Sequence, residues 1–274
     1  MAVTMKDISH MRKISGAGMM DCKKALVEAD GDYDKAMEII RKKGKAVAAK
    51  RSDRQAAEGC VLAAHEGDYA AVVALKCETD FVAKNAEFIA LTQSILDIAI
   101  KNKPADKEAL LAEKLGDGRS VQDHITDRIG VTGEKMELGY FDFAKGTSTV
   151  SYIHPGNKLA TVVAFNLDVD CQVARDIAMQ VAAMNPVSVT IDEVPVEIKE
   201  RELEIARDKA REAGKPEKLL DRIAEGSLQK YYKEYTLLLQ DFVKDSKMNI
   251  ESYLKSQNKD LTVLSFKRFT LNAD

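Results

Sequence analysis

The sequence has 274 residues, of which 45% are hydrophobic and 31% are charged, with a net charge of −3. This length and hydrophobic fraction suffice for one large domain or two to three small ones, each with its own core. No apolar run approaches the roughly 18 to 20 residues of a membrane span, and the charged N-terminus does not resemble a secretory signal, so we expect a cytoplasmic protein. The slightly negative charge argues against a general nucleic-acid binder.

Charge is unevenly distributed along the chain. Residues 1–54 contain 13 Lys and Arg against 8 Asp and Glu, so this region is positive while the remainder is negative. We therefore expect the N-terminal region to meet an acidic partner.

The four cysteines, Cys22, Cys60, Cys77 and Cys171, are dispersed and form no CxxC pair. This spacing is typical of reduced core thiols and not of a disulfide framework or a zinc site. Cys60 and Cys77 flank a predicted hairpin, which leaves their close approach open, but we expect free thiols.

Three short helices are predicted at the N-terminus, over residues 5–14, residues 19–29, and a third that ends at Lys43-Gly44. Their expected inward positions are Ile8, Met11 and Ile14, then Met20, Leu26 and Val27, then Ala36, Ile39 and Ile40. Met19 and Met20 open the second helix after a glycine loop, and Lys23 lies one turn further on. The two methionines either fill gaps in the core or expose an adaptable contact surface.

Residues 45–58 are small and charged and are interpreted as a linker with some helical character. Two strands follow, over residues 59–65 and 69–77, around the turn Glu66-Gly67-Asp68. A helix is predicted from Phe81 to Asn102, so residues 77–85 mark the end of a strand that turns into a helix.

Two interpretations of this junction are open. Thr79 and Asp80 are residue types that cap a helix N-terminus, and an Asp there also complements the helix dipole. On that view Phe81 simply packs inward. The alternative is that the junction presents these residues to a partner.

Further helices are predicted near residues 107–114 and 120–129. A second antiparallel set is expected from strands at 134–143, 147–154 and 159–166, covered by a helix over 171–184. Because 59–100 and 147–184 share the order of strands then helix, we predict an α+β fold with two related antiparallel-sheet-plus-helix subdomains.

An antiparallel helical hairpin is predicted as an insertion at about 192–228, with Gly214-Lys215-Pro216 as its stop and restart. A helix at 245–256 and a strand at 261–271 complete the chain. The predicted organisation is a three-helix N-terminal module with linker at 1–54, a core subdomain at 55–140, and a second core subdomain at 141–274 that carries the hairpin.

No catalytic pattern emerges from the residues. There is no Gly-rich phosphate loop after a strand, no GxSxG and no HExxH, and the four histidines lie in separate elements. We therefore expect no enzyme activity, no catalytic residue, no metal site and no cofactor.

Four separated motifs occur in one order: GAGMMDCKKAL at 16–26, ETDFVAKN at 78–85, AMQVAAMNP at 178–186 and GKP at 214–216. In this order they resemble the elongation factor Ts family of bacterial translation factors, and Phe266-Lys267-Arg268-Phe269 extends the likeness to the last strand. The resemblance implies that the N-terminal three-helix module is ubiquitin-associated-like, since the first motif is followed by Gly31-Asp32 and an Ala-rich third helix as in that family's N-terminal module. The chain ends soon after that strand, where some members carry another helical module, so contacts of that module do not transfer.

The resemblance implies a guanine-nucleotide exchange factor that binds elongation factor Tu with GDP, dislocates Mg²⁺ and promotes exchange of GDP for GTP. It implies that Thr79, Asp80, Phe81 and Val82 enter the GTPase beside its magnesium site, with Phe81 as an apolar wedge. The positive charge of residues 1–54 and the two methionines further suggest partner contacts at Met19, Met20 and Lys23, and His154 is a fourth expected contact. The other function considered is a helical adaptor or ribosome-associated chaperone without exchange activity. The sequence leaves a homodimer open.

Overall fold

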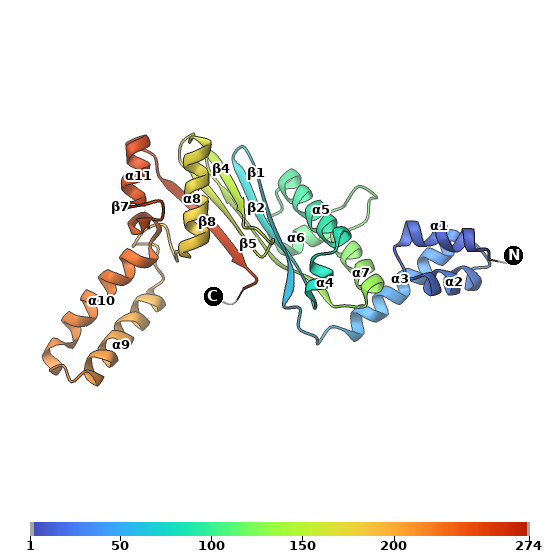
Figure 1. Cartoon of the computed structure of the whole chain (residues 1–274), viewed down its shortest axis with the longest axis horizontal. Coiled ribbons are helices and arrows are strands. Elements are labelled where there is room, and N and C mark those ends of the chain that lie inside the picture. Colours follow the sequence, from blue (N-terminus) through green and yellow to red (C-terminus); the bar gives the residue numbers. More distant parts are fainter. Residues whose placement is uncertain (1–2, 273–274) are drawn as a thin grey trace.

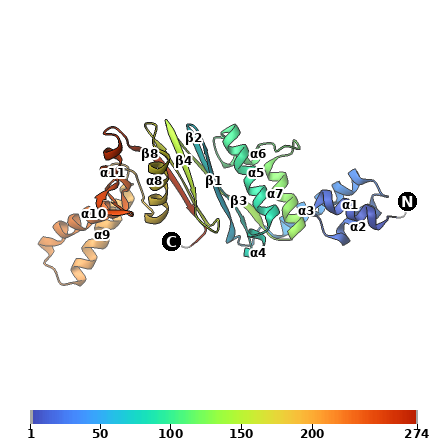
Figure 2. The ribbon, with the colours of Figure 1, turned by 45° about the horizontal axis from the view of Figure 1, so that its top comes forward.

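The computed structural model describes residues 3–272, so the predicted outer limits at residues 1 and 274 lie outside the described part. The centre of the molecule has four layers, helix, sheet, sheet and helix, which confirms the α+β class (Figure 1). A three-helix module projects from one end of this sandwich and a helical arm from the other, as the second view also shows (Figure 2).

The N-terminal module consists of α1 (Met5–Ser15), α2 (Met19–Glu28) and α3 (Tyr33–Lys50). Its small core gathers buried side chains from all three helices, among them Met11, Leu26 and Ala36. Three of the positions expected inside, Ile14, Met20 and Val27, are instead exposed. Three helices of this length enclose only a narrow core, so the apolar residues at its margin remain in water.

Helix α3 does not end at Gly44 as predicted, but continues to Lys50. Gly44 is buried against helix α7 (Val121–Thr132), where the two backbones cross at a second glycine. The absence of a side chain therefore serves close helix packing here and not a helix stop. As a result, half of the predicted linker is helical.

The first sheet contains three antiparallel strands in the order β1 (Glu58–Glu66), β2 (Tyr69–Cys77) and β3 (Met136–Lys145). Its outer face is covered by α5 (Ala86–Asn102), α6 (Lys107–Ala112) and α7, around buried Phe88, Ile95 and Ile125. The placement of β3 corrects the prediction, which assigned that strand to the second set. The predicted boundary at residues 140/141 falls inside β3, and the division into subdomains stays a prediction.

The second sheet has the order β4 (Ser148–Ile153), β5 (Leu159–Phe165) and β8 (Val263–Thr270), with α8 (Cys171–Met184) on its outer face. Between the two sheets lies a buried layer dominated by Ala and Val, including Ala63, Ala74, Ala160 and Ala164. Such small side chains let the two sheets approach closely, which makes the sandwich a stiff support for the loops at its ends.

The arm is an antiparallel pair of helices, α9 (Val196–Glu212) and α10 (Leu220–Tyr235), joined through the short helix η1 (Glu217–Leu219). At its base the Leu237 N–H donates to the Ser188 carbonyl at 2.9 Å. After η2 (Leu237–Leu239) the chain forms a small hairpin of β6 (Asp241–Phe242) and β7 (Asp245–Asn249). The helix predicted from 245 therefore begins only with α11 (Ile250–Gln257), because the Asn249 side chain caps it.

Within residues 3–272, no helix combines the length and apolar character needed to cross a membrane. The cysteine prediction is confirmed as far as pairing goes, since all four thiols are free. Cys171 departs from the expected core location, because it is exposed at the start of α8.

Candidate functional site

The predicted strand-to-helix junction forms a short helix, α4 (Asp80–Ala83), directly after β2. We call residues 79–82 the tip. Thr79 is the N-cap of α4, and its hydroxyl accepts a hydrogen bond from the Val82 N–H at 3.5 Å. The cap is thus Thr79 and not Asp80, which sits in the first helical turn, where its charge complements the dipole.

The helix predicted from Phe81 to Asn102 is divided into two. Helix α4 ends after one turn, and Asn85 then caps α5 by accepting hydrogen bonds from the Glu87 and Phe88 N–H groups at 2.9 and 3.3 Å. This second cap turns the chain, so the tip is a separate turn of helix that stands before the long helix.

Phe81 is the exposed apex of the tip, with 84% of its surface open to solvent. Its neighbours anchor the turn instead: Ala83 is buried in the first core and Val82 packs against that core. The inward-packing interpretation of Phe81 is therefore wrong. A solvent-exposed phenyl ring on an anchored turn of helix is typical of a contact made with another molecule.

Asp80 lies beside this ring and carries its charge in an exposed ion pair. Its carboxylate accepts from Lys84 Nζ at 2.6 Å. That hydrogen bond, followed by the positive charges of Lys84 and Lys158, lowers the pKa of Asp80 below its ordinary value. Asp80 is therefore ionised at neutral pH and available to act electrostatically on a partner.

Glu134, two residues after the end of α7, holds the base of the tip. Its carboxylate accepts from both the Thr79 N–H at 3.1 Å and the Thr79 hydroxyl at 2.6 Å. The sequence analysis missed Glu134, because it lies 55 positions from Thr79 and no local pattern connects the two.

Glu78, the residue that precedes the tip, is also held by hydrogen bonds. It accepts from Arg54 Nη1 at 2.9 Å and from the Lys135 N–H at 2.6 Å. The Lys135 hydrogen bond and the Arg54 contact, with a further charge from Arg51, lower the pKa of Glu78. The chain that leads into the tip is therefore attached through Glu78 to both Arg54 and Lys135.

The remaining predicted contact residues occupy two other places. Met19 and Met20 are 42% and 63% exposed at the start of α2, and Lys23 is exposed on the same helix, so the core interpretation of the methionines is wrong. His154 is exposed in the β4–β5 turn, with Tyr152 Oη 3.0 Å from its Nδ1.

The turn that contains His154 lies at the same end of the sandwich as the tip. Lys158, near the end of this turn, forms an ion pair at 2.9 Å with Glu58, and Glu58 pairs with Cys77 across the first sheet. The structure therefore places His154 near the tip, whereas Met19, Met20 and Lys23 belong to the separate N-terminal module.

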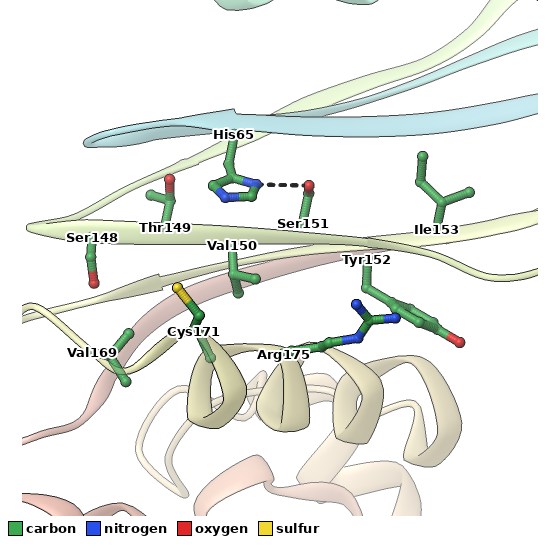
Figure 3. Close-up of a pocket in the computed structure, with 11 residues that line it drawn as sticks. His65, Ser148, Thr149, Val150, Ser151, Tyr152, Ile153, Val169, Cys171 and Arg175 are labelled. Carbon is green, nitrogen blue, oxygen red and sulfur yellow. Dashed lines mark hydrogen bonds between the residues drawn. The ribbon is translucent and has the colours of Figure 1, made fainter.

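An open pocket of about 430 Å³ lies along β4, between β1 on one side and the start of α8 on the other (Figure 3). His65 Nδ1 lies 2.9 Å from Ser151 Oγ on one wall, with Cys171 and Arg175 on the other. Among the described residues that line it, none is Asp or Glu. Across residues 3–272, no group of three or more His, Cys, Asp or Glu side chains is arranged to hold a metal ion.

An exposed aromatic ring on an anchored helical turn, together with a second exposed surface on a separate module, is typical of the class of proteins that bind other proteins. The comparisons with known proteins specify the class further. The model of the family described as "Elongation factor TS" matches residues 78–273.

Three relatives named elongation factor Ts cover all of this chain and are themselves fully covered. The protein of Porphyromonas gingivalis is 69% identical over 274 residues, that of Azobacteroides pseudotrichonymphae 56% over 275, and that of Bacteroides thetaiotaomicron 46% over 331 aligned residues. The chain belongs to the elongation factor Ts family, which confirms the resemblance. Membership makes it a nucleotide exchange factor for elongation factor Tu in translation elongation.

Proposed function

We propose that this chain, acting in the cytoplasm, releases GDP from elongation factor Tu by inserting the tip beside the nucleotide and dislodging the bound Mg²⁺. The observation that carries the proposal is the 84% exposure of Phe81 on a turn whose cap, base and following helix are all fixed. A GTPase holds GDP through its phosphate loop and Mg²⁺, so displacing the ion weakens the phosphate contacts.

Each tip residue has a role in this proposal. Phe81 is an apolar wedge between elements of the partner, and burial of its ring contributes about 1.5–3 kcal/mol. Asp80, ionised beside Lys84, competes electrostatically with the groups that hold Mg²⁺. Thr79 and Val82 shape the turn that carries them.

The other exposed residues act as docking contacts. The region 1–54 carries an excess of positive charge, and its methionines Met19 and Met20 offer adaptable apolar surface beside Lys23. His154 adds a contact near the tip. The factor needs no catalytic residue. If it binds the nucleotide-free partner more tightly than the GDP-bound partner, its binding must weaken the affinity of the partner for GDP by the same factor.

The test measures release of a fluorescent GDP analogue from elongation factor Tu with wild-type protein and with Phe81→Ala. From the burial energy above, we expect the variant to release GDP about 10 to 150 times less efficiently. Val243→Ala is the matched control, since Val243 is another exposed apolar residue, located in the β6–β7 turn. Binding of wild-type protein without accelerated release would instead support the adaptor function.

A further inference from the structure

We propose that α7 is a brace that fixes the N-terminal module relative to the tip, and that Gly130 is the positioning residue of this brace. The proposal rests on the function above, in which module and tip meet the same partner. It concerns a helix that contains none of the predicted contact residues.

The module rests on α7 at a crossing of two glycines. A Cβ added to Gly130 would lie 2.6 Å from Gly44 Cα, and one added to Gly44 would lie 3.3 Å from the Thr126 carbonyl oxygen. The first distance is shorter than real Cβ atoms tolerate, so any side chain at Gly130 must push α3 away from α7. One turn before Gly44, Arg41 Nε approaches Asp127 on α7 at 3.9 Å.

The loop that precedes Met19 and Met20 also lies against α7. A Cβ at Gly16 would come within 3.7 Å of Val131 Cγ2 and of Arg128 Nη1. Met19 begins α2 only three residues later. Helix α7 therefore contacts the module at two separate places, which constrains its orientation as well as its position.

The same helix holds the tip from the other side. Arg128 Nη2 donates to Asn85 Oδ1 at 3.1 Å and forms an ion pair with Glu87, so it contacts the turn between α4 and α5. Glu134, two residues after α7 ends, accepts both hydrogen bonds from Thr79. Thr79 at the start of the tip and Asn85 shortly after it are thus attached to α7 or to the residues that directly follow this helix, on which the module rests.

A fixed spacing between two binding surfaces matters because it makes the second contact intramolecular. When one surface has bound, the other is held at a high effective concentration only if the geometry permits simultaneous engagement. A module displaced from α7 would lose this advantage without losing any residue that contacts the partner.

A first experiment tests the brace without the partner. Spin labels at Lys24→Cys on α2 and Ser94→Cys on α5, both exposed positions, are placed in a Cys171→Ser background, since the other three cysteines are buried. We expect one narrow distance distribution, which broadens or shifts progressively in Gly130→Ala and Gly130→Leu. Gly226→Leu is the matched control, because a Cβ at this other helical glycine meets nothing within 4 Å. A distribution in Gly130→Leu identical to that of the control would overturn the proposal.

A second experiment measures exchange with the full chain. For Gly130→Leu we expect the half-saturating concentration to rise roughly tenfold or more, with the maximal release rate retained. In the wild-type background, Met20→Ala should raise the half-saturating concentration. In the Gly130→Leu background it should change this concentration little, since the misplaced module no longer docks. Equal effects of Met20→Ala in both backgrounds would contradict the brace. If Phe81→Ala released GDP like wild type, the proposed function would fail, while the distance measurement would still judge the brace.

Discussion

Removal of the Glu134 carboxylate tests whether the tip must be ordered to act. Glu134→Ala eliminates the acceptor for two hydrogen bonds from Thr79, at 2.6 and 3.1 Å. A hydrogen bond to a charged group contributes about 1.5–3 kcal/mol, and because both residues are half-buried we assign about 2 kcal/mol to the pair together. A loss of that size shifts the equilibrium between ordered and frayed tip by about 30-fold.

Two measurements on the same variant should report this one equilibrium. The Ala83 and Lys84 N–H groups donate to the carbonyls of Thr79 and Asp80 at 3.2 and 3.1 Å, so their hydrogen-exchange protection follows tip order directly. Release of the fluorescent GDP analogue follows its functional consequence. We expect both to fall, each by up to about 30-fold, while global thermal unfolding changes little, because α4 is a single exposed turn.

The controls separate order from charge. Glu134→Gln keeps one acceptor oxygen and should fall between wild type and Glu134→Ala. Glu137→Ala removes a nearby carboxylate on β3 whose ion pair is with Lys135, and should leave both measurements unchanged. If protection of Ala83 and Lys84 were lost entirely while GDP release stayed at the wild-type rate, an ordered tip would not be required, and this prediction would be refuted.

Three further predictions concern single side chains. Asp80→Asn keeps the Thr79 cap and loses only an exposed ion pair, which contributes little to stability, so it should slow GDP release most at high Mg²⁺; release equal to wild type across a Mg²⁺ titration would exclude the electrostatic role. The lowered pKa of Glu78 contributes stability that is present above its ordinary value of 4.5 and is lost as the pH falls through the lower folded value. In Glu78→Gln the urea concentration at the midpoint of unfolding should therefore decrease less steeply as the pH is lowered in the acid range. The same pH dependence as in the wild type would contradict this. Native protein should react with one equivalent of a thiol reagent, at Cys171, because Cys22, Cys60 and Cys77 are buried and burial raises the pKa of Cys60 to about 11 and of Cys77 to about 12; mass spectrometry would reveal any second fast site.

The periodic parts of the fold could be predicted from the sequence. The continuous apolar run in 69–77 and the helical spacing in 171–184 predict β2 and α8 correctly. The run is typical of a strand buried on both faces, and the spacing marks the one helix face that meets the core. Gly44 misled the prediction, since a glycine that ends a helix and a glycine that permits a helix crossing look alike until the second helix is known. The pairing of β3 with β2 likewise depends on a contact across more than 50 residues.

The candidate site divides in the same way. Residues 77–85 were identified as a junction of interest, but local sequence left Phe81 and the methionines with either an inward or an outward orientation. Their exposure follows from how little core the tip and the small module can enclose, which is a property of the assembled layers. The support of the tip by Glu134 and Arg128 was invisible because both act through three-dimensional proximity alone.

The N-terminal module and the tip are suited to two different kinds of contact with the partner. A contact made equally well with nucleotide-bound and nucleotide-free partner raises affinity but shifts no equilibrium, whereas a contact available only after nucleotide loosens drives release. The module presents charge and flexible methionines, which suit the first kind of contact, and the tip presents one anchored ring, which suits the second. Truncation of Phe81 should therefore lower the maximal release rate, while loss of the module should raise the half-saturating concentration. Because α7 connects the module rigidly to the tip, binding of the module to the partner holds the tip at a high effective concentration beside its own contact site.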